Sequence, residues 1–154
     1  MADLKIIETG DGGDAVLLNN DLVVIGGFQN MPYLGMFGGN VEESTTGPKE
    51  TSEQSFDWWG NNLLMQNDYL IQFNSLLENT LKNVSLTPSG RLQIINVIKD
   101  DIQFMKEFSI TSVDASIVSN DRIEIYIKIQ EPNNLESNDF TYIWDSTNNE
   151  LTTL

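Results

Sequence analysis

The chain of 154 residues contains neither cysteine nor histidine. Without cysteine there is no disulfide framework, no thiol nucleophile and no thiolate metal site. Without histidine, the commonest general acid–base group and the commonest metal ligand are both missing. Catalytic triads built on either residue and His-ligated zinc are therefore excluded, which leaves only carboxylate, Lys, Tyr or hydroxyl chemistry. We expect no enzymatic activity, no metal and no cofactor.

Basic residues are scarce: 8 Lys and Arg oppose 23 Asp and Glu, which gives a net charge of −15. Residues 1–80 hold two basic and twelve acidic residues, residues 81–130 six of each, and residues 131–154 five acids and no base. Nucleic acids and anionic membranes are bound through clustered Lys and Arg, so we expect neither as a partner. A solvated acidic surface explains this charge, and the alternatives are basic partner proteins or mimicry of a polyanion.

Long apolar runs are also missing, since no stretch reaches the roughly 18 apolar residues of a membrane-spanning helix. The first residues lack the basic and apolar regions of a signal peptide. We therefore expect a soluble protein made in the cytoplasm, folded as one domain or as one domain with an extra arm.

Two of the three tryptophans are adjacent, at Trp58 and Trp59. Each indole buries roughly 150–250 Å² and carries an N–H group that needs a partner. The pair is either a core anchor or a contact for another protein, and tryptophan is common in both roles. Asp57 is the one acid whose apolar neighbour superficially suits a catalytic carboxylate, but a cap or turn role fits it better.

Residues 1–28 are predicted to form an N-terminal β arm. Short aliphatic runs alternate with turn residues at 10–14 and 19–21, where Gly, Asn and Asp favour hairpins. Three short strands in a meander are expected. The acids in these turns do not match the calcium loop of an EF-hand, so turn chemistry is the better explanation.

Residues 29–55 are predicted to be an irregular insertion loop, far longer than the usual ~4–6 residues. Tyr33, Met36 and Phe37 lie within it. Their apolar side chains either strap onto this domain or insert into a neighbouring subunit. We expect deletion of residues 29–54 to leave a folded core and to abolish assembly with partners.

Residues 56–132 are predicted to form an α+β core that begins with two helices. The first spans 67–82, and the second starts at Thr87-Pro88, a cap followed by proline at the first helical position, and runs to about Glu107. Their short link predicts a helical hairpin. The expected buried side chains are Leu70, Phe73, Leu77 and Leu81 on the first helix and Leu92, Ile94, Ile95, Ile98, Ile102 and Met105 on the second.

Residues 110–118 and 122–130 are predicted to form a β-hairpin, because Ile123, Ile125, Ile127 and Ile129 alternate with polar residues. A sheet with one apolar face after two amphipathic helices predicts an α+β layer, with the two-helix hairpin packed on a small antiparallel β-sheet. In the C-terminal strand and tail, residues 133–154, Phe140, Tyr142 and Trp144 alternate. They form either a third strand or an exposed strand for a partner.

The order of these elements and several markers resemble the Mu-like baseplate wedge family of contractile-tailed phages. The markers are the run Trp58-Trp59-Gly60-Asn61, a helix with Ser75, Glu78 and Leu81, a helix with Asp101, and a hairpin that ends in Glu131-Pro132. The similarity covers residues 3–28 and 56–132. The Glu-Pro-Arg element of the broader superfamily is absent, because Asn133 follows Glu131-Pro132.

The resemblance implies a structural protein of the virion, located in the tail baseplate in several copies and made in the host cytoplasm. Such a wedge subunit joins other wedge proteins to the tail tube and sheath. The expected interaction residues are Trp58, Trp59, Tyr33, Met36, Phe37, Tyr142 and Trp144. An acidic protein-binding module, such as an inhibitor that mimics nucleic acid, is the alternative function.

Overall fold

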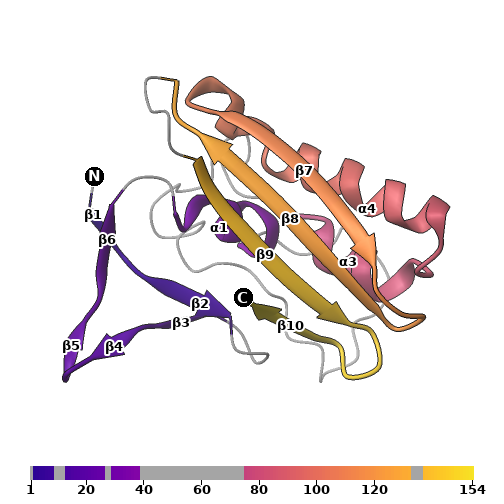
Figure 1. Cartoon of the computed structure of the whole chain (residues 1–154), viewed down its shortest axis with the longest axis horizontal. Helices are drawn as coiled ribbons and strands as arrows, with labels where there is room; N and C mark the ends of the chain where they lie inside the picture. The colour runs from indigo at the N-terminus through magenta and orange to yellow at the C-terminus, as the bar shows by residue number, and fades with distance from the viewer. Residues whose placement is uncertain (1, 9–12, 27–28, 39–74, 133–136) are drawn as a thin grey trace, which may run out of the picture.

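The computed structural model describes residues 2–8, 13–26, 29–38, 75–132 and 137–154. These residues combine α-helices with small antiparallel sheets, as the sequence predicts (Figure 1). A four-stranded sheet lies against helices, and the six short N-terminal strands form a separate triangular arm to one side. Among the described helices, none has the length and apolar composition required to cross a bilayer.

The main sheet has the strand order β10-β9-β8-β7 and is antiparallel throughout. Its first hairpin pairs β7 (Ile110–Ile117) with β8 (Arg122–Gln130), which confirms the predicted hairpin. The C-terminal segment adds β9 (Ser137–Asp145) and β10 (Glu150–Thr153) to the same sheet. The core therefore extends beyond residue 132, where the sequence analysis placed its end.

The isoleucine face of β8 is the centre of the core. Ile123, Ile125, Ile127 and Ile129 are all buried, whereas Tyr126 and Lys128 between them are exposed. This alternation follows from the two-residue period of a strand, which sends successive side chains to opposite faces. The prediction that only one face of the sheet is apolar is confirmed.

Helices cover that face. α3 (Leu77–Asn83) and α4 (Pro88–Asp101) contact each other, and a 3₁₀ turn, η2 (Gln103–Glu107), follows α4. α4 starts as predicted, because the Thr87 side chain accepts a hydrogen bond from the backbone N–H of Gly90 at 3.2 Å. The buried helical side chains are Leu77, Leu81, Ile94, Ile95, Ile98, Ile102 and Met105.

Two helix predictions need correction or lie outside the described residues. Leu92 is 54% exposed, because it falls off the stripe that faces the sheet, so its assignment to the core was wrong. The first helix is described only from Leu77. Its predicted start at 67, together with Leu70 and Phe73, lies outside the described residues.

Part of the segment predicted as an irregular loop is helical. α1 spans Met31–Phe37, with Pro32 in its first turn, and packs near α3 and α4. Its close approach depends on Gly35, where an added Cβ would lie 3.0 Å from Phe104 Cε1. α1 is thus a third helical element of the core, and the remainder of the predicted loop, from residue 39, lies outside the described residues.

Candidate interaction surfaces

The N-terminal arm consists of three two-stranded ribbons that meet at one point (Figure 1). β1 (Ala2–Leu4) pairs with β6 (Val24–Gly26), β2 (Ile6–Glu8) with β3 (Gly13–Ala15), and β4 (Leu17–Leu18) with β5 (Asp21–Leu22). The sequence predicted short strands here, but in a three-strand meander. The chain instead breaks each long strand in the middle, so that its halves pair with different neighbours.

Three residues at these breaks close a ring of backbone hydrogen bonds. The N–H of Lys5 donates to the carbonyl of Val23 at 2.8 Å, that of Val23 to Val16 at 2.9 Å, and that of Val16 to Lys5 at 3.0 Å. Each residue donates once and accepts once. The ring therefore satisfies the backbone groups that leave the ribbons at the junction.

The strand register places six apolar side chains on one face of the arm, and it places Leu18 with Asp21 and Ile25 with Asp3 on the other. Cross-strand partners share a face, and the partners next to the ring are Leu4 with Val24, Ile6 with Ala15, and Leu17 with Leu22. Residues two positions apart also share a face. The period continues across Lys5, Val16 and Val23, so all three pairs lie on the same side. We call this surface the arm face: Leu4, Ile6, Ala15, Leu17, Leu22 and Val24.

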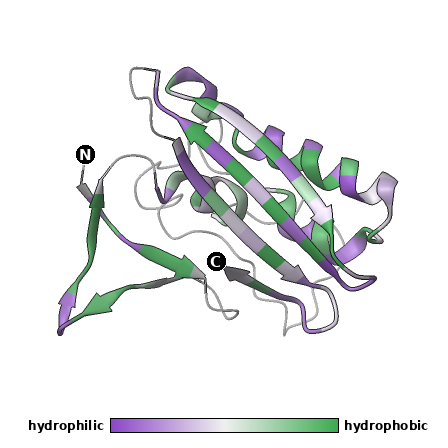
Figure 2. Cartoon of the chain, in the orientation of Figure 1, coloured by the Kyte–Doolittle hydropathy of each residue, from purple (hydrophilic) through white to green (hydrophobic). Residues whose placement is uncertain are grey.

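The arm face is exposed although every member is apolar. Leu17 is 67% exposed and Val24 is 60% exposed, and Leu4 and Leu22 are 41% and 45% exposed. Figure 2 colours much of the same strands as hydrophobic, and β2 lies in contact with β10 of the main sheet. None of these residues is among the interaction residues predicted from the sequence. The sequence does place apolar residues on either side of each turn. Which of them share a face follows only from the pairing register of the strands.

Asn30 fastens the arm to α1. Its buried side-chain amide donates to Asp3 Oδ2 at 2.9 Å and to the carbonyl of Leu4, and its Oδ1 accepts from the N–H of Ile6 at 3.2 Å. The Asn30 carbonyl accepts from the N–H of Leu34 in the first turn of the helix. One residue thus joins the first two strands of the arm to the helix, and the arm has a defined attachment.

Tyr33, Met36 and Phe37 pack on this domain. Met36 is fully buried, and Tyr33 and Phe37 are partly buried against the core. The Phe37 ring lies 5.4 Å from that of Tyr33 and 6.4 Å from that of Tyr142 on β9, centroid to centroid. These side chains were expected either to pack on this domain or to insert into a neighbouring subunit, and the structure shows the first arrangement. Met36, predicted as an interaction residue, is a core residue.

Tyr142 and Trp144 are likewise core residues, at 2% and 3% exposure. They lie on β9 beside Ile125 and Ile123, because the apolar alternation of β9 matches that of β8. Burial raises the pKa of Tyr142 well above its ordinary value. Their assignment as contact residues is therefore corrected, and the strand is the predicted third strand of the sheet. Trp58 and Trp59 lie outside the described residues, as does Asp57.

Asp101 joins three helices. From the end of α4, its carboxylate accepts the backbone N–H groups of Leu76 and Leu77 at 3.1–3.2 Å, and the Ser75 hydroxyl lies 3.2 Å from Oδ2. The Ser75 hydroxyl also donates to the Met36 carbonyl of α1, so one proton serves two acceptors. Burial raises the pKa of Asp101 to about 6, against the opposing effect of these hydrogen bonds.

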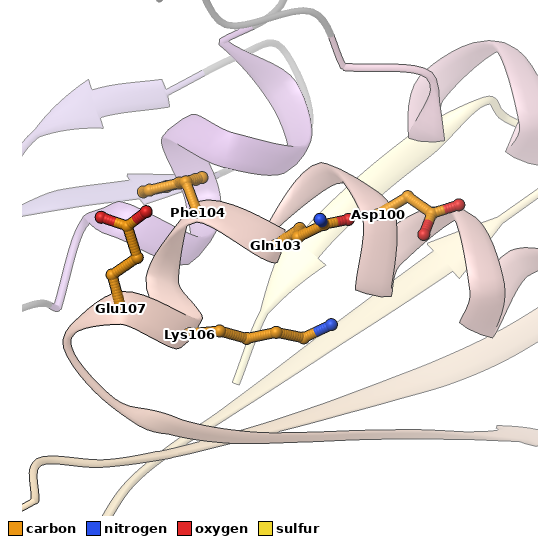
Figure 3. A pocket seen from close by; sticks show the side chains of 5 residues that line it. All are labelled: Asp100, Gln103, Phe104, Lys106 and Glu107. Atoms are coloured by element: carbon orange, nitrogen blue, oxygen red, sulfur yellow. The ribbon is translucent and has the colours of Figure 1, made fainter.

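One open depression lies beside the end of α4. It is lined by residues of α4 and η2, and Phe104 turns toward α1 while Lys106 and Glu107 point in different directions (Figure 3). The charged groups do not converge on one point (Figure 3). Among the described residues, no three acidic side chains are grouped as ligands for a metal ion. The lining residues are Asp100, Gln103, Phe104, Lys106 and Glu107.

Polar side chains tie the two turns at one end of the sheet together. Arg122 donates to Asp145 Oδ2 at 2.9 Å, and the Asp121 carbonyl accepts from the N–H of Ser146 at 2.7 Å. The hydrogen bond from Arg122 lowers the pKa of Asp145, and the Ser119 hydroxyl lowers that of Asp121. Both carboxylates therefore form hydrogen bonds that stabilise the turns.

Comparison with known proteins gives no relative: no family model, no curated protein and no solved structure matches this chain.

Proposed function

We propose that the chain is an assembly subunit of a contractile phage tail, a wedge component of the baseplate that joins wedge proteins to the tail tube and sheath. The exposed apolar arm face is the observation that supports an assembly role. A soluble monomer rarely leaves a contiguous apolar surface in water, and such surfaces mark sites of protein contact. The baseplate setting rests on the resemblance of residues 3–28 and 56–132 to the wedge family.

The core anchors the arm that carries the arm face. In our proposal, the α3–α4 hairpin packed on the four-stranded sheet is the fixed body, and Asn30 holds the arm beside it. β7 lies at an edge of the sheet, where an exposed strand can accept another strand. Arg91 covers part of this edge, because it donates to the carbonyl of Ala115 at 2.8 Å. The arm is therefore the better candidate for the principal contact.

Deletion of residues 29–54 is not a clean test of this function. It would remove α1, and with it the fully buried Met36 and the Asn30 attachment of the arm. Loss of assembly would then follow from loss of folding. We therefore do not expect the core to stay intact after this deletion.

Purified particles give a cleaner test. We expect mass spectrometry of contractile tails from the encoding phage to detect the chain at a fixed ratio to the tube and sheath proteins. We expect a strain that lacks its gene to make tubes or sheaths without complete baseplates, as seen by negative-stain microscopy. Tails of normal form from that strain, or particles free of the chain, would contradict the proposal.

The net charge of −15 supports the second candidate, an acidic module that mimics nucleic acid. Two bases on the outer face of the sheet argue against it, since Lys128 lies opposite Asp139 in the strand register, and Arg122 forms an ion pair with Asp145. A mimic needs a surface of one sign. Binding to a basic host protein that falls steeply with added salt would favour the mimic, whereas contacts through the arm face would persist in salt.

A further inference from the structure

We propose that Asp101, Ser75 and the Met36 carbonyl form a pH-sensitive latch, which holds α1 and the attached arm to the core when Asp101 carries a proton and loosens them when that proton is lost. All groups of the latch belong to this chain, so it does not depend on the baseplate role. Its behaviour follows from the number of protons in the cluster and from the atoms that need them.

α1 stands between the arm and the other helices (Figure 1). At its start, the Asn30 side chain holds the first two strands of the arm. At its end, the Met36 carbonyl accepts the hydroxyl of Ser75, whose Oγ lies 3.2 Å from Asp101 Oδ2 at the end of α4. Polar contacts therefore connect α4 to both ends of α1 and, through its start, to the arm.

The Met36 carbonyl depends on Ser75 for a hydrogen bond. α1 ends at Phe37, so a carbonyl in its last turn has no N–H group of the same helix to accept. Met36 is fully buried, and a buried backbone acceptor without a donor destabilises the folded state. The Ser75 proton is therefore needed on the side of Met36.

Asp101 competes for the same proton when it is charged. A hydroxyl has one proton to donate, and a carboxylate can only accept. When the Ser75 proton lies on the Met36 carbonyl, Ser75 Oγ and Asp101 Oδ2 face each other at 3.2 Å with no hydrogen between them. A hydrogen bond to a charged acceptor is stronger than one to a neutral carbonyl. The charged carboxylate therefore draws the Ser75 proton away from Met36.

A proton on Asp101 removes this competition. The protonated Oδ2 donates to Ser75 Oγ, and the Ser75 hydroxyl donates to the Met36 carbonyl, so each acceptor has its own donor. Oδ1 continues to accept the N–H of Leu76 at 3.2 Å. On deprotonation the proton leaves Oδ2 for water, the Ser75 hydroxyl turns to the carboxylate, and the Met36 carbonyl loses its donor. Burial raises the pKa of Asp101 to about 6, which places this change near neutral pH.

The surroundings of Asp101 contain no histidine, the residue that ordinarily titrates near pH 6, because the chain has none. Asp100 is the neighbour whose charge acts on Asp101, and it raises the pKa. On α3, Lys82 forms an ion pair with Glu78, and the two charges of η2 have opposite signs. The titratable groups on α1, α3, η2 and the last turn of α4 are Tyr33, Glu78, Lys82, Lys106, Glu107, Lys99, Asp100 and Asp101.

Hydrogen exchange resolved by residue, measured by NMR on the full chain at pH 5 and pH 7.5, tests the latch. The reporting amides are Leu34 and Gly38 in α1, and Ile6, whose N–H donates to Asn30 Oδ1 where the arm is attached. The closed state binds the proton more tightly, so its advantage is lost as pH rises through about 6. We expect the protection of these amides, corrected for the intrinsic effect of pH on exchange, to fall by about three- to tenfold. The larger value applies if opening restores the ordinary pKa of 3.8 to Asp101.

Two variants separate the latch from a general effect of pH. Asp101→Asn carries an amide that donates to Ser75 Oγ at every pH and so imitates the protonated acid. Its α1 amides should keep their protection within about twofold between the two pH values. Ser75→Ala removes the group that connects Asp101 to α1 but keeps the N–H groups of residues 76 and 77 on the carboxylate. Its α1 amides should be weakly protected at both pH values, with a change of less than about twofold.

Asp100→Asn is the matched control, because it removes one negative charge at the adjacent, exposed position. It should keep a fall in protection of at least about threefold. Equal protection of α1 at pH 5 and pH 7.5 in the wild type would overturn the proposal, as would a full response in Asp101→Asn or Ser75→Ala. Loss of the response in Asp100→Asn would do the same. Circular dichroism establishes folding, and the wild type with Asp101→Asn decides the outcome even if Ser75→Ala does not fold.

Discussion

Replacing Ile125 with Ala is expected to lower the free energy of unfolding by about 3 kcal/mol, within the range for buried Ile to Ala changes. Ile125 is fully buried at the middle of β8 and lies between Ala115 of β7 and Tyr142 of β9. Ala115 is too small to fill the space left behind, and Tyr142 is held by its own strand. The cavity should therefore persist, and urea denaturation at neutral pH measures its cost.

An exposed residue of the same strand provides the control. Lys128→Ala alters the polar face three positions away and should change the free energy of unfolding by less than about 0.5 kcal/mol. Equal effects of the two changes would mean that the helices do not cover the isoleucine face. The layer arrangement on which the core description rests would then be wrong.

The second large effect is a dependence of stability on pH that originates at Asp101. Burial raises its pKa from 3.8 to about 6 in the folded chain. Between about pH 4 and pH 6 the folded state therefore holds a proton that the unfolded chain has released, and the free energy of unfolding falls as pH rises through this window. Such a rise in pKa corresponds to at most about 3 kcal/mol. Partial exposure of the carboxylate lowers the expectation to about 2 kcal/mol.

Asp101→Asn isolates this effect. The Asn amide keeps an acceptor for the N–H groups of Leu76 and Leu77 and adds a donor for Ser75, but it does not titrate. We expect the variant to be at least as stable as the wild type at pH 7.5, and to lose the gain that the wild type shows on acidification to pH 4.5. Parallel stability curves for the two proteins from pH 4 to pH 7 would show that Asp101 is not the source.

The acids in the sheet turns change the free energy of unfolding with pH in the opposite direction and over a lower pH range. The pKa values of Asp121 and Asp145 are lowered by their hydrogen bonds, so their contribution is present above the ordinary value of 3.8 and is lost as pH falls below it. The Asp101 effect ends where theirs begins. Measurements between pH 4 and pH 7 therefore report chiefly on Asp101 among these three groups.

The elements that the sequence predicts well are those with a strict apolar period. The isoleucines of β8 alternate without exception, and Thr87-Pro88 combines a cap with a proline suited to the first turn, so local chemistry alone specifies both. Leu92 was misplaced because it lies three residues before Ile95, about 60° around the helix axis, just outside the stripe that Ile94, Ile95 and Ile98 bury. A residue at the margin of a helical stripe can be exposed although its spacing matches the buried positions.

The candidate site was harder to predict because it depends on contacts between distant segments. Asp101 is partly buried because residues 75–77 reach it from elsewhere in the chain, and Ser75 links it to α1. Tyr142 and Trp144 are equally apolar whether a strand lies in a sheet or awaits a partner, and only the pairing of β9 with β8 distinguishes these cases. The arm face emerged only from the register of three ribbons, since Leu4, Ile6 and Leu17 belong to different ones.

The most direct test of the arm as an assembly contact uses the absence of cysteine from the chain. Leu17→Cys introduces a single thiol at the most exposed position of the arm face. We predict that this thiol reacts with a maleimide quickly in the free protein, at least about tenfold more slowly in assembled tail particles, and quickly again once the particles are dissociated. An equal rate in the free protein and in particles that contain the chain would contradict the account.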